Sequence, residues 1–228
     1  MNTLRGPSLL TIAALAIGVY GPPAMAQESA IDRLTPVTDE MLRNPPDGDW
    51  LMWRRTYDGA GYSPLDRLNK ENVGELELAW SWGMTPGRTE ETPLAHDGIL
   101  YVTHHADKTQ AFDGATGELI WTYQHQLPEG YPTPRGMRSK AIYDDKLIIA
   151  TSDAHLIALD AKTGDVIWDK QVANWEHGWG YTSGPIVADG VIVQGMTRCG
   201  NAQPGGCYVT GHDVKTGEEL WRVHTIAR

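Results

Sequence analysis

Three stretches of the chain share one phrase: AFDGATGELIW at residues 111–121, ALDAKTGDVIW at 158–168 and GHDVKTGEELW at 211–221. Each phrase has an Asp, a Thr-Gly pair beginning three residues later, and a Trp four residues after that Gly. The Asp side chain can bond to the backbone of its own turn, and the Gly supplies the positive φ that the turn needs. The phrase therefore predicts a strand, a tight turn and a second strand that alternates into the Trp.

A second signal precedes each phrase, namely two apolar runs separated by an acidic turn. The turns are Asp97-Gly98, Asp144-Asp145 and Asp189-Gly190. Asp-Gly between apolar runs is a strong β-hairpin signal. Each unit then has four short antiparallel strands, and four strands in about 45 residues is the pattern of a propeller blade. The sequence predicts an all-β chain, a β-propeller with about three four-stranded antiparallel blades, preceded by an earlier strand over 76–82 that contains Trp80.

The first 26 residues have the order of a secretory signal peptide. Arg5 precedes an apolar run over residues 9–17, and Ala24-Met25-Ala26 follows as an A-x-A cleavage site. The run is shorter than the about 20 residues that cross a bilayer, so we expect cleavage after Ala26 and export to the periplasm rather than a membrane anchor. The predicted organisation is a signal peptide over 1–26, an N-terminal segment over 27–75 and a partial propeller over 76–228.

Composition limits the partners and the redox chemistry. The net charge of −10 argues against nucleic acid as a partner, because nucleic acid selects basic surfaces. The only two cysteines, Cys199 and Cys207, lie close together in an exported chain and predict a disulfide. The sequence has no C-x-x-C-H motif for covalent haem.

Three polar residues share a position relative to the repeat. Glu90 and Thr182 each lie seven residues before a hairpin Asp, and Arg138 lies six before one. The first strand of each blade lines the propeller axis, so we expect the three side chains to converge at one end of the central channel. An Arg offers a bidentate fork to carboxylate or quinone oxygens, so this end suits an anionic, carbonyl-rich cofactor. The alternative is a set of solvated loops.

The repeat phrase resembles the Trp-docking repeat of the dehydrogenases that depend on pyrroloquinoline quinone (PQQ). The resemblance extends over residues 49–228 and includes Trp53-Arg54-Arg55, the GYSPL stretch at 61–65 and Asn72-Val73. It implies an eight-bladed propeller that binds PQQ with a metal ion, Ca²⁺ or a lanthanide, and oxidises alcohols or sugars in the periplasm. It also implies an external electron acceptor, such as a soluble cytochrome c or a quinone.

The resemblance assigns PQQ contacts to Glu90, Arg138 and Thr182. Two features depart from the family. Pro132 and Thr133 stand where many members have adjacent cysteines. The loop over 195–206 has no acidic residue where many members supply a metal-binding Glu, although Asn201 or Gln203 could offer a neutral oxygen. We therefore assign no metal ligand.

In the family, the catalytic Asp comes from later blades, so no catalytic residue is assigned either. The function expected is that of an N-terminal fragment of a periplasmic PQQ-dependent alcohol dehydrogenase, acting on the CH–OH group of alcohols or sugars and inactive by itself. The alternative is a non-catalytic PQQ-like propeller scaffold of envelope assembly. Two interpretations also stay open for Trp175, His177 and Trp179, which could pack on a planar quinone or between blades.

Overall fold

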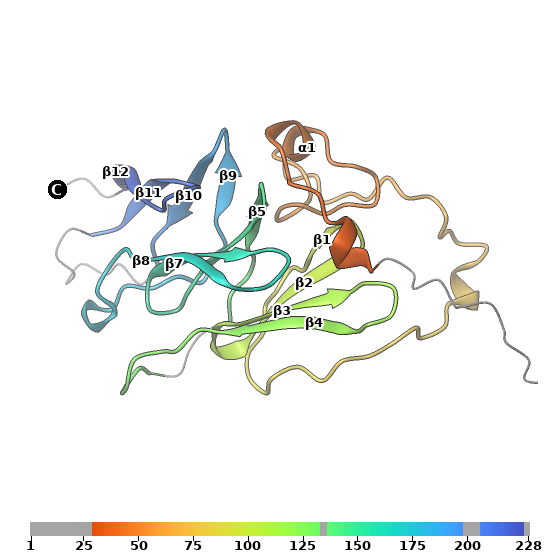
Figure 1. Ribbon diagram of the computed structural model, residues 1–228, viewed down its shortest axis with the longest axis horizontal. Helices are drawn as coiled ribbons and strands as arrows, with labels where there is room; N and C mark the ends of the chain where they lie inside the picture. The colour runs from red at the N-terminus through yellow and green to blue at the C-terminus, as the bar shows by residue number, and fades with distance from the viewer. Residues whose placement is uncertain (1–28, 133–135, 198–205, 226–228) are drawn as a thin grey trace, which may run out of the picture.

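The described part of the chain is built from three four-stranded antiparallel sheets (Figure 1). The computed structural model describes residues 29–132, 136–197 and 206–225. Blade 1 consists of β1 (Leu94–His96), β2 (Ile99–His104), β3 (Lys108–Asp113) and β4 (Leu119–Gln124). Blade 2 consists of β5 (Ala141–Tyr143), β6 (Lys146–Ala150), β7 (His155–Asp160) and β8 (Val166–Gln171). Blade 3 consists of β9 (Ile186–Ala188), β10 (Val191–Gly195), β11 (Tyr208–Asp213) and β12 (Glu219–His224).

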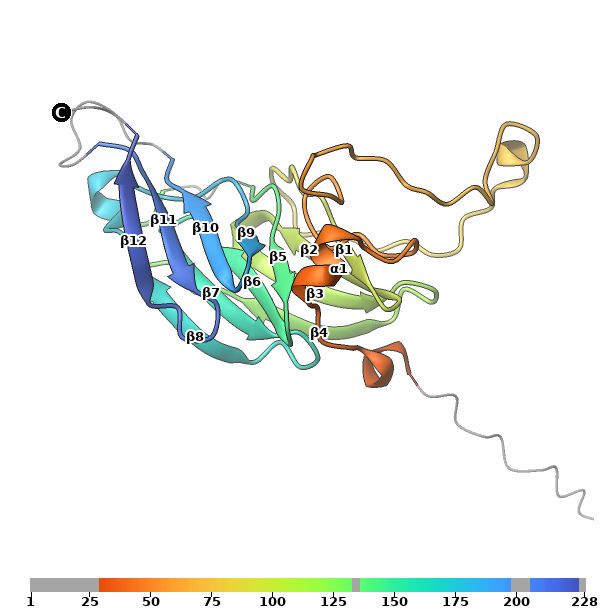
Figure 2. The same cartoon turned by 90° about the horizontal axis from the view of Figure 1, so that it is seen from above.

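The strands pair in chain order within every blade, and the blades are arranged as a fan (Figure 2). The short first strands lie toward the centre of the fan, where β5 contacts β9. The last strands lie at the outside and are more exposed, whereas every residue of β6 is buried. The all-β class and the three predicted hairpins are therefore confirmed. Asp97, Asp144 and Asp189 take up the turns with φ of 48°, 54° and 48°, a region that Asp tolerates better than most residues.

The Trp that ends the repeat phrase in blades 1 and 2 packs on the turn of the following blade. Trp121 donates from Nε1 to the carbonyl oxygen of Ala161 at 3.1 Å, and its ring lies on Gly164. The same arrangement joins Trp168 to Val214 and Gly217, and Trp80 to Gly114 and Gly117. The repeat phrase thus encodes both a turn and the surface on which the preceding Trp docks.

The strand predicted over 76–82 is wrong. Residues 76–82 are all described and none of them is in a strand. Leu76 and Leu78 are exposed, at 63% and 83% of their accessible surface. A strand needs a ladder partner for its backbone groups, and none of the described strands pairs with this segment. Trp80 still docks on blade 1, so the docking of the Trp does not require its own segment to be a strand.

We expect Gly164→Ala to destabilise the protein by about 1–3 kcal/mol more than Gly130→Ala, because the new methyl group would overpack a docked ring. The two glycines have nearly equal φ, +76° and +77°, so backbone strain cancels in the comparison. A Cβ at Gly164 would lie 2.7 Å from Cδ2 of Trp121, whereas a Cβ at Gly130 meets nothing within 4 Å. Urea unfolding measures the difference. Equal losses would contradict the docking of Trp121.

An N-terminal clasp, residues 30–57, ties together the hairpin turns of all three blades. It begins with a 3₁₀ turn (Ala30–Arg33) and the short helix α1 (Asp39–Arg43). Its bonds reach Asp97 from Thr35, Asp144 from Val37, and Asp189 from Asp39 and Arg43. These turns end the first strands, so the clasp covers the end of the strands opposite to the end where the chain enters them.

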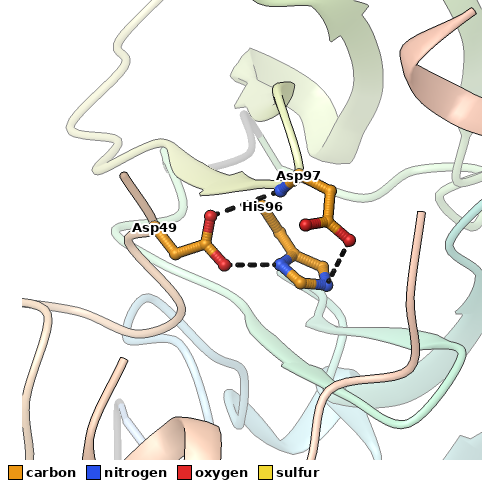
Figure 3. A group of neighbouring side chains, drawn as sticks. All are labelled: Asp49, His96 and Asp97. Atoms are coloured by element: carbon orange, nitrogen blue, oxygen red, sulfur yellow. Dashed lines mark hydrogen bonds and ion pairs between the residues drawn. The ribbon is translucent and has the colours of Figure 1, made fainter. Parts of the chain in front are cut away.

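A group of three side chains within this contact consists of Asp49 and His96, which are buried, and Asp97, which is partly exposed (Figure 3). Nδ1 of His96 lies 2.7 Å from Asp49 Oδ2, and Nε2 lies 2.8 Å from the carbonyl oxygen of Thr35. Both partners are acceptors, so both ring nitrogens must donate and the ring carries a positive charge. Burial by itself lowers the pKa of His96, but the bonds to Asp49 and Thr35 offset this and raise the pKa.

The stability that His96 contributes should therefore be lost as the pH rises. The pKa is higher in the folded state than in the unfolded state. The contribution is therefore complete below about pH 6.5, the unfolded value, and declines as the pH passes through the folded pKa. We expect the free-energy difference between the wild type and His96→Gln to shrink as the pH rises above about 6.5. Unfolding at several pH values measures it, with His177→Gln, an exposed position, as the control. A pH-independent difference would contradict a charged His96.

No helix in the described ranges is long and apolar enough to cross a membrane. The signal peptide predicted over 1–26 lies outside the described residues. That prediction and the domain boundary at residue 75 therefore stay predictions.

Candidate functional site

The residues that lead into the first strand of each blade lie side by side. We call residues 90–93, 138–140 and 182–185 the lead-in segments of blades 1, 2 and 3. The backbone N–H of Thr92 donates to the carbonyl of Arg138 at 3.0 Å, and the N–H of Arg138 donates to the carbonyl of Thr182 at 3.1 Å. Arg138 therefore occupies the middle of a hydrogen-bonded row across three blades.

The three predicted site residues are brought together by direct side-chain contacts. Arg138 Nη2 lies 2.8 Å from Glu90 Oε2, and Nη1 donates to Thr182 Oγ1 at 3.2 Å. Arg88 pairs with the other oxygen of Glu90. The side chain of Arg138 remains 51% exposed, so part of its guanidinium is open to a ligand. The predicted convergence is confirmed, whereas the predicted role in binding PQQ stays a prediction.

Glycines allow this close approach, and the sequence interpretation did not include them. A Cβ at Gly136 would lie 2.6 Å from the carbonyl oxygen of Arg88. A Cβ at Gly184 would lie 2.2 Å from both the carbonyl carbon and the carbonyl oxygen of Ser139. The sequence does place each of these glycines two residues from a predicted site residue, Gly136 from Arg138 and Gly184 from Thr182. That spacing was the available sequence signal for the close approach. A side chain at either glycine would push the lead-in segments apart.

A buried ion pair beneath these contacts was also missed. Lys140 is fully buried, and its Nζ contacts Glu91 Oε1 and the carbonyl oxygen of Tyr101, the latter at 3.3 Å. Glu91 Oε2 is buried and has no hydrogen-bond partner among the described residues. Burial lowers the pKa of Lys140 to about 7. The only sequence signals were a charge next to Glu90 and a charge two residues after Arg138, and charges before a strand ordinarily face solvent.

The arrangement favours an anionic ligand over a metal ion. A guanidinium held by a carboxylate and a hydroxyl keeps a fixed orientation and can donate to carboxylate or carbonyl oxygens. The only cluster of three potential metal ligands in the described ranges is Asp49, His96 and Asp97, at the opposite end of the first strands. Both ring nitrogens of His96 already face oxygen acceptors. The cluster therefore suits a protonated His96 better than a neutral His96 that binds a metal ion.

The aromatic residues after blade 2 pack against other aromatic rings of the protein. Trp175 meets Tyr131 edge to face with ring centroids 5.2 Å apart, and Trp179 lies 6.1 Å from Tyr208 of blade 3. His177 lies 5.9 Å from Trp179. These contacts favour the packing interpretation of this stretch. Contact with a quinone stays a prediction.

Besides the residues of the predicted signal peptide, Thr133, Cys199, Asn201 and Gln203 lie outside the described residues. The Cys199–Cys207 disulfide therefore stays a prediction. We expect a bridged peptide in mass spectra of an unreduced digest of exported protein, because close cysteines oxidise in that compartment. Two free thiols in such material would contradict it.

Comparison with known proteins gives a consistent result. The family model for the β-propeller domain of PQQ-type glucose, ethanol and alcohol dehydrogenases matches residues 50–228. The dehydrogenase subunit of alcohol dehydrogenase (quinone) from Gluconobacter oxydans (strain 621H) is 38% identical over 94% of this chain and 29% of its own length. Quinoprotein ethanol dehydrogenase from Pseudomonas aeruginosa is 33% identical over 96% of this chain and 36% of its own length.

Solved structures agree with these sequence matches. Quinohemoprotein alcohol dehydrogenase from Comamonas testosteroni aligns with a TM-score of 0.74 and 32% identity, over 86% of this chain and 30% of its own. A europium-containing methanol dehydrogenase aligns with a TM-score of 0.72 and 26% identity, over 83% of this chain and 34% of its own. The chain thus spans about a third of the length of the relatives it matches.

Proposed function

The chain belongs to the PQQ-type β-propeller family of glucose, ethanol and alcohol dehydrogenases, and from that membership we propose that it forms one side of a PQQ site. The whole protein would be a periplasmic oxidoreductase that acts on the CH–OH group of alcohols or sugars. The described ranges hold three blades of the propeller. We assign them the role of binding and orienting the cofactor, with no catalytic base.

The observation that carries the proposal is the row formed by Glu90, Arg138 and Thr182. The side chain of Arg138 is half exposed, and its guanidinium is held on two sides, at 2.8 Å and 3.2 Å. Such a fork would pair with the acidic or quinone oxygens of PQQ, and the hydroxyl of Thr182 would add one neutral hydrogen bond. When bound, PQQ supplies a quinone that accepts two electrons from the alcohol carbon.

The oxidation of an alcohol also needs groups other than Glu90, Arg138 and Thr182. A base must take the hydroxyl proton of the substrate, and a cation, Ca²⁺ or a lanthanide, would polarise the quinone. We also propose an external electron acceptor such as a soluble cytochrome c or a quinone.

Fluorescence titration of the purified protein with PQQ, in the presence of Ca²⁺ or a lanthanide, tests the binding role. Oxidation of ethanol and of glucose with an artificial electron acceptor then tests the activity. Saturable binding of one PQQ per protein would support the proposal. Absence of binding with both cations would overturn it and favour the non-catalytic scaffold.

A further inference from the structure

Two ion pairs cross from blade 1 to blade 2 one beside the other. Glu90 and Arg138 form the exposed pair, with side chains 27% and 51% exposed. Glu91 and Lys140 form the buried pair, with side chains 3% and 0% exposed. The two acids are consecutive and the two bases are separated by one residue, so both pairs join the same lead-in segments.

We infer that Glu91 and Lys140 are positioning residues, which hold blades 1 and 2 in the alignment that places Glu90 opposite Arg138. The inference concerns the site of the proposed function and so rests on it. It assigns the buried pair no contact with a ligand. Its effect passes through the backbone of residues 90–91 and 138–140.

Burial gives this pair its positional effect. An exposed ion pair can separate at little cost because water solvates both partners. A buried pair cannot, because each separated charge would remain desolvated. Lys140 also donates to the carbonyl of Tyr101 in β2, and the second oxygen of Glu91, Oε2, has no hydrogen-bond partner among the described residues. The pair therefore defines one favourable alignment of the lead-in segments of blades 1 and 2. Apolar side chains in its place would allow several alignments.

The lead-in segment of blade 2 is supported from its other side by blade 3. The backbone of Ser139 and Lys140 lies against Gly184, where an added Cβ would be 2.7 Å from the backbone nitrogen of Lys140. The side chain of Lys140 thus reaches blade 1 while its backbone abuts blade 3. Arg138, two residues earlier, has little freedom to shift along the row.

The test compares the purified, PQQ-free wild type with the apolar double variant Glu91→Leu/Lys140→Met. A double variant is used because removing both charges leaves neither one unpaired. The control is Glu219→Leu/Arg222→Met, which removes an ion pair from the outer strand of blade 3. Three quantities are measured: the Tm, the ¹⁵N side-chain NMR signals of Arg138 (identified by their loss in Arg138→Lys), and the Kd for PQQ.

The inference predicts that the double variant is folded, that its Arg138 signals broaden and that its Kd for PQQ rises at least tenfold. The control should leave the Arg138 signals and the Kd unchanged. A purely structural pair would leave both unchanged in any folded variant, and that result would overturn the inference. Should the wild type bind no PQQ, the proposed function fails, while the Arg138 signals still decide the inference.

A second variant covers the case in which the double variant does not fold. Glu91→Gln keeps the shape of the side chain and removes the acid of the pair. Burial lowers the pKa of Lys140, so in this variant the amine can lose its proton instead of remaining as an unpaired buried charge. Broadened Arg138 signals in this variant, with both proteins recorded at pH 7, would support the inference, and signals like those of the wild type would overturn it.

Discussion

Arg138→Ala is expected to weaken PQQ binding more than any other single substitution in the row. Once a ligand covers this end of the blades, losing the guanidinium leaves an anionic group unpaired, which costs about 2–5 kcal/mol. At about 1.4 kcal/mol for each factor of ten, the Kd should rise by about thirtyfold to a few thousandfold. Activity of the whole protein at saturating PQQ should fall much less, because Arg138 is assigned to binding.

The other two substitutions should have smaller effects. Glu90→Gln keeps an acceptor oxygen for the guanidinium and removes only the charge. Thr182→Val keeps the shape and removes one hydrogen bond, worth about 0.5–1.5 kcal/mol. Arg222→Ala is a matched control, since Arg222 pairs with Glu219 on the outer strand β12. PQQ titration of all four variants measures the order, and equal affinities throughout would mean that the row does not face the cofactor.

The sequence predicted the blades because their signals are local. The turn Asp, the positive-φ Gly and the Trp lie within nine residues of each other, and short-range hydrogen bonds fix their geometry. The convergence of Glu90, Arg138 and Thr182 followed from the same repeat. Similar spacing from equivalent turns, seven residues for Glu90 and Thr182 and six for Arg138, means similar height along equivalent strands, and no knowledge of side-chain contacts was needed.

The sequence could not predict features that depend on contacts between distant segments. Residues 76–82 alternate as a strand would, yet no described strand pairs with them. The clasp residue Thr35 reaches Asp97, 62 residues away, and nothing near either residue indicates the other. Glu91 and Lys140 are 49 residues apart, and the sequence around each residue predicts an exposed charge. Their burial becomes evident only when the two lead-in segments lie side by side.

Lys140→Met should be the most destabilising of the substitutions considered, at about 3–5 kcal/mol, because it leaves Glu91 buried without its countercharge. The double variant Glu91→Leu/Lys140→Met should recover most of this loss, since an apolar pair of similar volume needs no charge compensation. Lys70→Met is the control, because Lys70 pairs with Glu71 at the surface, where both side chains are exposed, and its loss should cost under about 1 kcal/mol.

The loss in Lys140→Met should also depend on pH with a defined sign. Without Lys140, the only way to relieve the buried charge of Glu91 is to protonate it, so its folded pKa would exceed the unfolded value of about 4.3. The folded state would then bind more protons than the unfolded state between these two values, and lowering the pH would favour folding. We expect the destabilisation relative to the wild type to shrink by up to about 1.4 kcal/mol for each unit between pH 7 and pH 5. Urea unfolding at pH 5, 6 and 7 measures it. A loss that is independent of pH and is not recovered in the double variant would mean that Lys140 contributes by packing of its aliphatic chain rather than by its charge.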